Sequence, residues 1–120
     1  MKVIEIAFSA YPVTDLARAR AFYEGVLGLT PHIMGNPNWV EYYIGEHTLG
    51  IGVAEGWSPS KDGGSVGLEV EDFDGAIAEL KAAGVTFRME PFPTPVCRMA
   101  IISDPDGNSL LIHKRHAGNH

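Results

Sequence analysis

The sequence predicts an α+β fold built from two copies of one small module, each with the order strand, helix and three strands. Three observations lead to this prediction. Two segments have apolar residues at helical spacing, and each follows an aspartate and ends before a glycine. Short apolar-rich segments that suit strands flank both helices. A stretch rich in glycine, serine and proline, residues 55–64, separates the two halves like a linker.

The helices are expected near residues 15–27 and 72–83. Asp15 and Asp72 each offer a side-chain oxygen to the first turn of the helix that follows. A glycine directly after each helix is a stop signal. When Asp15 is aligned with Asp72, the two halves match through the helix and its glycine, which indicates an internal repeat.

Each half is expected to contain four strands. One of them begins near His32, directly after Pro31, and the other seven have predicted ranges. They lie at residues 4–11, 40–44, 49–53, 65–70, 85–89, 99–103 and 109–113. The segment Pro91 to Pro95 is expected as a loop, and Asp104 to Asn108 as a tight turn.

A module of about 50 residues is too small to bury its own sheet face. Two modules are therefore expected to pack together, within one chain or across a dimer, as a curved mixed sheet around a cleft. The predicted organisation is one domain over residues 1–120. It has a first module at about 1–54, a linker at about 55–64 and a second module at about 65–115.

Composition excludes several classes of partner. A net charge of −6 disfavours nucleic acid, because binding to phosphates needs a basic surface. No apolar run approaches the ~20 residues that a membrane span requires. Cys97 is the only cysteine, so no internal disulfide is possible, and a reducing cytoplasm is the expected location.

Several motifs together resemble the vicinal-oxygen-chelate superfamily, which contains glyoxalases, bleomycin resistance proteins and extradiol dioxygenases. Residues 13–16, 21–23 and 27–29 resemble its N-terminal signature. Residues 72–85 resemble the helix of its second module, and 104–108 resemble the turn before its last strand. The resemblance covers nearly the whole chain. It implies the glyoxalase/bleomycin-resistance fold, but a fold alone does not fix the chemistry.

The resemblance also implies a divalent metal in the cleft, held by one residue from each of four strands. Counted from the two helix caps and the turn, these positions fall on Phe8, Gly50, Ser65 and Leu111. Serine is a poor ligand and the other three have no lone pair to offer. The sequence therefore predicts no metal and no cofactor. A displaced site using Glu69 and His113, completed by a second copy of the chain, stays open.

A cleft without metal ligands suits a small organic molecule. Trp39, Tyr42 and Phe8 are the stacking candidates and Glu69 is the charge partner, while small residues leave the floor of the cleft uncrowded. The alternative is that the aromatics are core residues and Glu69 is an exposed rim residue. The predicted ligand-binding residues are Phe8, Trp39, Tyr42, Gly50, Ser65, Glu69, Leu111 and His113. No catalytic residue is assigned.

The leading hypothesis is a metal-free, bleomycin-resistance-like protein that binds an aromatic or cationic small molecule as a cytoplasmic homodimer. The first alternative is a metal-dependent lyase, isomerase or dioxygenase of the same superfamily, which would need a metal to stabilise charge on the substrate. The second is a partner-binding or regulatory domain without a ligand of its own. The sequence leaves the identity of the ligand and any catalysis open.

Overall fold

The structure is a computed structural model that describes residues 2, 4–33 and 35–116. The chain divides into two compact units, residues 1–59 (unit 1) and 60–120 (unit 2). The division falls inside the region 55–64 that has linker composition. That both modules form one domain stays a prediction. Within the described part of the chain, no helix is long and apolar enough to cross a membrane.

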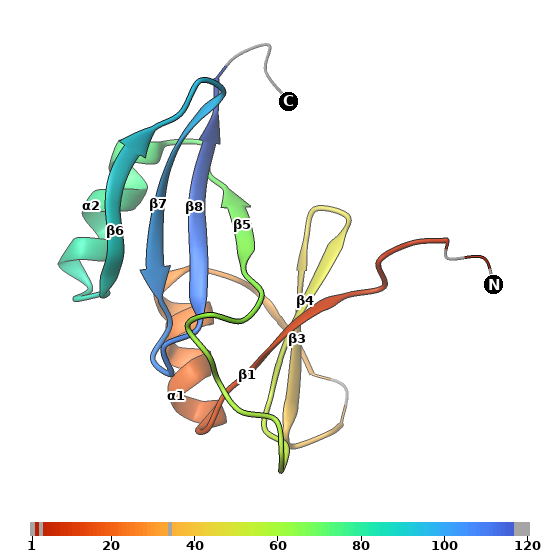
Figure 1. The fold of residues 1–120 in the computed structure, drawn as a ribbon. Helices are drawn as coiled ribbons and strands as arrows, with labels where there is room; N and C mark the ends of the chain where they lie inside the picture. Colours follow the sequence, from red (N-terminus) through yellow and green to blue (C-terminus); the bar gives the residue numbers. More distant parts are fainter. Residues whose placement is uncertain (1, 3, 34, 117–120) are drawn as a thin grey trace. The chain divides into compact units, whose positions relative to one another are not determined.

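Unit 1 contains a four-stranded mixed sheet and one helical segment (Figure 1). The strand order is β1-β4-β3-β2, in which β1 runs parallel to β4 and the other neighbours are antiparallel. The elements are β1 (Ser9–Pro12), α1 (Leu16–Arg20), η1 (Ala21–Val26), β2 (Pro31–His32), β3 (Trp39–Ile44) and β4 (His47–Gly52).

Unit 2 repeats this topology. Its strand order is β5-β8-β7-β6, with β5 parallel to β8 and antiparallel pairing elsewhere. The elements are β5 (Val66–Glu69), α2 (Phe73–Ala82), β6 (Phe87–Pro93), β7 (Cys97–Ser103) and β8 (Ser109–Arg115). The predicted α+β fold class, with two modules of the βαβββ kind, is confirmed.

The two helix caps have the same geometry in both units. Asp15 Oδ1 and Asp72 Oδ1 each accept a hydrogen bond of 3.1 Å from the backbone N–H three residues further on. Gly28 and Gly84, which follow the helices, have φ of 72° and 75°. Only glycine adopts this left-handed conformation without strain, which explains why the helices end there.

The first helix differs from the expected continuous α-helix. After α1 the chain widens into the π-helical segment η1, where the N–H of Leu27 donates to the carbonyl of Phe22 at 3.0 Å. In such a segment the donor lies five positions after the acceptor along the chain, instead of four as in an α-helix. Phe22 and Tyr23 are both buried in it.

Two strand predictions need correction. The first strand begins at Ser9 and not at residue 4, because β1 aligns Ser9 with Leu49 and β4 starts only two residues earlier, at His47. Most of the preceding segment therefore lies beyond the start of its neighbour. In unit 2, β6 continues to Pro93 through part of the expected loop. It is an edge strand with irregular register, where proline is tolerated.

The Asp-Pro-Asp-Gly-Asn turn is held by its own side chains. Asp104 Oδ1 accepts from the backbone N–H groups of Asp106 and Asn108, both at 2.9 Å. Asn108 in turn accepts from the N–H of Ser60 at 3.3 Å. The turn joins β7 to β8. Through the hydrogen bond from Ser60, it also holds the beginning of unit 2 close to the ends of these two strands.

Candidate functional site

The two faces of the unit 1 sheet have different environments. Side chains alternate along a strand, so Trp39, Glu41 and Tyr43 lie on one face of β3, and Val40 and Tyr42 on the other. Val40 and Tyr42 are buried. We call the face that carries Trp39, Glu41 and Tyr43 the open face of unit 1.

Two glycines on the open face are covered by the indole ring of Trp39. In the antiparallel register, Trp39 is opposite Gly52 and Glu41 is opposite Gly50. A side chain at either glycine would collide with ring atoms of Trp39. This corrects the expectation that Gly50 leaves an uncrowded floor, because the tryptophan fills the space.

Phe8 and Trp57 complete an aromatic cluster around Trp39. The ring of Phe8 meets Trp39 edge to face, with centroids 5.8 Å apart. Trp57 is stacked on the other indole with a centroid distance of 6.4 Å and an interplanar angle of 26°. Phe8 is 52% exposed and Trp57 is 36% exposed, so the cluster is accessible on this face of unit 1.

Tyr42 belongs to the core and not to this cluster. Its side chain is 0% exposed and lies stacked against Tyr23 at 5.9 Å. The hydroxyl donates to Glu24 Oε2 at 2.9 Å, and Glu24 pairs with Arg20 at 2.6 Å. Burial, with the bond to Glu24, raises the pKa of Tyr42, while the hydrogen bond from Arg20 lowers the pKa of Glu24. The expectation that Tyr42 stacks on a ligand beside Trp39 is therefore wrong.

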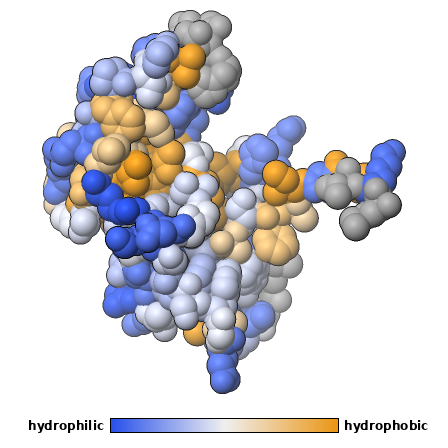
Figure 2. Space-filling model, viewed as in Figure 1, coloured by the Kyte–Doolittle hydropathy of each residue, from blue (hydrophilic) through white to orange (hydrophobic). Residues whose placement is uncertain are grey.

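We call the face of the unit 2 sheet that carries Glu69, Leu111 and His113 the open face of unit 2. These three are predicted site residues. The parallel register places Gly67 beside Leu111 and Glu69 beside His113. Met99 pairs with His113 and Ile101 pairs with Leu111, so all four side chains lie on the same face. All four are partly exposed. Figure 2 shows hydrophobic surface in the region where Figure 1 draws β7 and β8. Ser65 is exposed and precedes β5.

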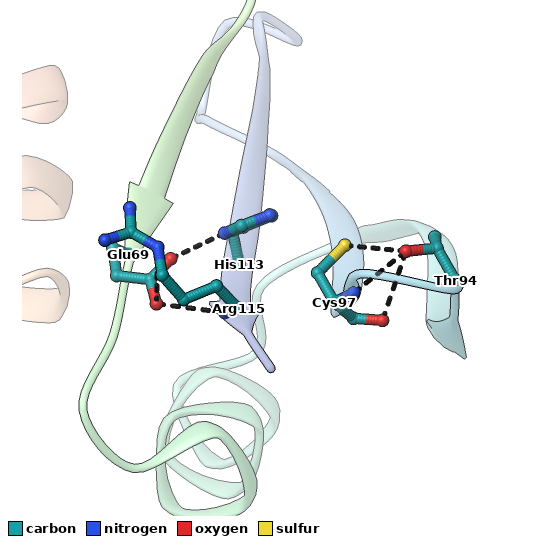
Figure 3. A network of polar contacts seen from close by, with 5 residues as sticks. All are labelled: Glu69, Thr94, Cys97, His113 and Arg115. Carbon is teal, nitrogen blue, oxygen red and sulfur yellow. Dashed lines mark hydrogen bonds and ion pairs between the residues drawn. The ribbon is translucent and has the colours of Figure 1, made fainter. Parts of the chain in front are cut away.

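Glu69 is the centre of a polar network on this face (Figure 3). Its Oε1 lies 2.5 Å from His113 Nδ1, and its Oε2 accepts from the backbone N–H of Arg115 at 3.0 Å. Partial burial by itself raises the pKa of Glu69. The hydrogen bonds from Arg115 and His113 and the nearby charges outweigh burial, so the net pKa is lowered. Glu69 is held in its ionised form.

The contact with Glu69 also orients the imidazole of His113. With the proton on Nδ1 donated to the carboxylate, Nε2 of the neutral ring is an acceptor. Figure 3 shows the second ring nitrogen pointing away from Glu69. A carboxylate and histidine in this arrangement can exchange a proton with a bound molecule or accept a hydrogen bond from it.

Cys97 is a structural residue. It is buried at the start of β7, and its Sγ lies 3.0 Å from Thr94 Oγ1. The same Thr94 hydroxyl accepts from the backbone N–H of Cys97 at 3.0 Å. A buried thiol in such a contact is typical of an inert cysteine.

Both units match one family model over most of the chain. The model of the Glyoxalase/Bleomycin resistance protein/Dioxygenase superfamily matches residues 5–112. The chain belongs to this superfamily. The resemblance stated from the sequence motifs is thereby confirmed. No match is found among the curated proteins.

Solved structures share the fold of this superfamily member. A superfamily protein from Sphaerobacter thermophilus is 27% identical, with a TM-score of 0.76, and covers 93% of this chain and 98% of its own. A putative glyoxalase family protein from Bacillus anthracis is 19% identical, with a TM-score of 0.80 and coverage of 97% and 100%. A lactoylglutathione lyase from Agrobacterium tumefaciens is 20% identical, with a TM-score of 0.75 and coverage of 94% and 95%.

The residues present do not fit the metal expected in this superfamily. Phe8 contributes a ring to the aromatic cluster, and Gly50 lies under Trp39. Leu111 is apolar, and Ser65 supplies at most a weak hydroxyl ligand. Among residues 2, 4–33 and 35–116, no three His, Cys, Asp or Glu side chains gather closely enough to hold a metal ion.

Glu41 is a candidate residue that is absent from the sequence-based prediction. Its Oε2 accepts a hydrogen bond of 2.9 Å from Trp39 Nε1, on the face where the aromatic rings gather. The signal was present in the alternation Trp39-x-Glu41-x-Tyr43, which places the three on one side of a strand. No motif fixes the register of this strand, so the sequence alone does not tell which of Glu41, Tyr42 and Tyr43 share a face with Trp39.

Proposed function

We propose that this chain is a metal-independent, bleomycin-resistance-like protein that binds an aromatic or cationic small molecule on the open faces of its two units. The observation that carries this proposal is the position of Trp39. Its ring lies over Gly50, where the superfamily resemblance expects a metal ligand, and forms a cluster with Phe8 and Trp57. Aromatic rings, which can stack on a ligand, occupy the positions where side chains that coordinate a metal would be needed.

Unit 2 supports the same proposal with different chemistry. Glu69 is held ionised, and His113 lies beside it on a face that also carries the apolar side chains of Met99, Ile101 and Leu111. Apolar walls with a few polar groups are typical of small-molecule sites. Phe8 and Trp39 remain in the proposed binding surface of unit 1, and Glu69, Leu111 and His113 remain in that of unit 2. Tyr42 is removed, because it is buried.

The test combines elemental analysis with ligand binding. We expect the purified chain to hold far less than one divalent metal, and chelator treatment to leave its melting temperature unchanged. Planar aromatic and cationic compounds should raise the melting temperature, because a ligand that binds only the folded state stabilises it. One tightly held metal per chain, whose removal abolishes a lyase or dioxygenase activity, would instead favour the enzyme alternative.

A homodimer is part of the proposal. Ile4 and Ile6, in the segment before β1, are 79% and 83% exposed. Apolar side chains exposed to this degree are costly in water unless a second chain covers them. Light scattering should give twice the mass of one chain, and the double substitution Ile4→Ser with Ile6→Ser should shift the chain toward the monomer. A wild-type monomer at micromolar concentration would refute the dimer and leave ligand binding untouched.

A cytoplasmic location completes the proposal. Cys97 is the only cysteine, and it is buried as a free thiol. A protein without disulfides suits a reducing compartment. Fractionation of the cells that make the protein tests this point directly.

A further inference from the structure

We propose that the open face of unit 1 recognises an alkylated ammonium group, with Glu41 as its counter-charge and Trp39 and Tyr43 as aromatic walls. This inference rests on the proposed function and narrows it from aromatic or cationic molecules to one chemical group. It also assigns the recognition to unit 1 by itself, through residues that differ from the carboxylate and histidine of unit 2.

The first observation is the order of side chains along β3. Glu41 lies between Trp39 and Tyr43 on one face, since every second residue of a strand points the same way. Trp39 Nε1 donates to Glu41 Oε2 at 2.9 Å, so the indole and the carboxylate fix each other's position. A carboxylate has room for several hydrogen bonds or for a cation beside the one it already accepts.

The second observation is the number of aromatic rings around this carboxylate. Trp39 is joined by Phe8 and Trp57 on one side of Glu41. On the other side, Tyr43 is 56% exposed, and the centroid of its ring lies 4.9 Å from that of His32. His32 is the residue of β2 that lies opposite Glu41 of β3. The faces of such rings carry negative charge and attract a cation within about 6 Å.

The third observation is the charge of unit 1. Its two arginines are engaged on the helix, where Arg18 donates to Thr14 and Arg20 pairs with Glu24. The one lysine of unit 1, Lys2, is exposed near the N-terminus, and Glu41 is the carboxylate that contacts the aromatic cluster on the open face. The field of this carboxylate favours a cation over a neutral or anionic ligand.

An alkylated ammonium fits this surface better than a primary amine. A primary ammonium is strongly hydrated and needs several acceptors to replace its water. A quaternary ammonium carries methyl groups that contact ring faces, and it requires no hydrogen bond. Aromatic rings with a carboxylate are the surface that recognises such groups.

The probe for this inference is choline, and its control is 3,3-dimethylbutan-1-ol, which has the same shape without the charge. Trp39 and Trp57 are the only tryptophans of the chain, so the two indole N–H signals in an NMR titration report on this surface alone. We expect choline to shift both signals in a saturable way, and the neutral alcohol to bind roughly tenfold more weakly.

The variant Glu41→Gln removes the charge and keeps an acceptor for the indole N–H. It should weaken choline binding roughly tenfold and leave the response to the neutral alcohol unchanged. Glu46→Gln is the matched control, since Glu46 is exposed in the turn that follows β3 and should bind choline like the wild type. An unchanged melting temperature in Glu41→Gln establishes that the variant is folded.

Each outcome decides between the inference and the proposed function. Equal binding of choline and the alcohol, or a Glu41→Gln variant that binds choline normally, overturns the inference. The same holds if neither probe shifts the indole signals while planar aromatic compounds still do, and in that case the proposed function survives. If no compound of either class binds, both are wrong.

Discussion

The two units share a backbone plan and differ in what they place on their open faces. Both have the same strand order, an aspartate cap and a left-handed glycine after the helix. Unit 1 fills its open face with aromatic rings over two glycines, whereas unit 2 carries an ionised carboxylate beside a histidine on apolar neighbours. The features that determine the fold are duplicated, and those that determine chemistry are not.

This difference follows from where each set of side chains lies. Buried positions such as Tyr42 in unit 1 and Ile112 in unit 2 must fill space in a core, which restricts them to apolar or aromatic residues. Positions on the open faces have no such restriction, so one unit can use stacking and the other a charged pair. Four sets of substitutions test how the two units, and the two faces of their sheets, differ.

The largest effect is expected for Tyr42→Ala compared with Tyr43→Ala. Tyr42 is buried against Tyr23, so its truncation should lower the free energy of unfolding by ~3–5 kcal/mol. Tyr43 is exposed on the other face, and its truncation should cost less than about 1 kcal/mol. Urea denaturation measures both. Equal costs would show that the two faces of β3 are not distinct.

The next effect concerns a glycine on each open face. Gly50→Ala puts a methyl group into the ring of Trp39 and should cost ~1–3 kcal/mol of stability through overpacking. Gly67→Ala meets no atom within 4 Å, and should be neutral or stabilise by up to about 1 kcal/mol. The comparison by urea denaturation fails if both variants behave alike.

The helix caps should give equal effects in the two units. Asp15→Ala and Asp72→Ala each remove an acceptor at 3.1 Å, and each should cost ~1 kcal/mol. Replacement by asparagine, which caps nearly as well, is the control. Thermal unfolding measures the loss of stability in each variant. A large difference between the two alanine variants would mean that the two caps do not stabilise their helices equally.

The smallest effect is the pH dependence that arises from Glu69. Its pKa is lowered in the folded state, so its contribution is present above the pKa of the unfolded chain and is lost as the pH falls through the folded value. Because the group is partly exposed, we expect a contribution of at most about 1 kcal/mol. Glu69→Gln should flatten the fall in unfolding free energy between neutral and acidic pH. An unchanged slope in the variant would contradict the lowered pKa.

Most of the fold could be predicted because its signals are local. Asp15, Asp72 and the turn at Asp104 each act on a backbone group within a few residues, so the sequence alone indicates the helices, the turn and the repeat. Strand ends depend instead on where a neighbour begins. The N-terminal strand was predicted too long because His47, the start of its partner, lies far along the chain.

The candidate site was predicted only in part, for the same physical reason. Glu69 and His113 were expected on one face because a cap and a turn fix the register of their strands. No such signal fixes the register of β3, so the sequence does not indicate that Glu41, and not Tyr42, shares a face with Trp39. The ring of Trp39 lies over Gly50 on the neighbouring strand. Nothing in the sequence around either residue predicts this contact.

That contact also makes positions 39 and 50 mutually dependent in any stepwise series of mutations. A carboxylate introduced at position 50 first meets the indole ring, and a smaller residue introduced at position 39 first loses its contacts with Phe8, Trp57 and Glu41. Either single step lowers stability, and only the double change reaches a face with room for a ligand at position 50. The aromatic surface is therefore separated from a face with a carboxylate at position 50 by at least one less stable intermediate.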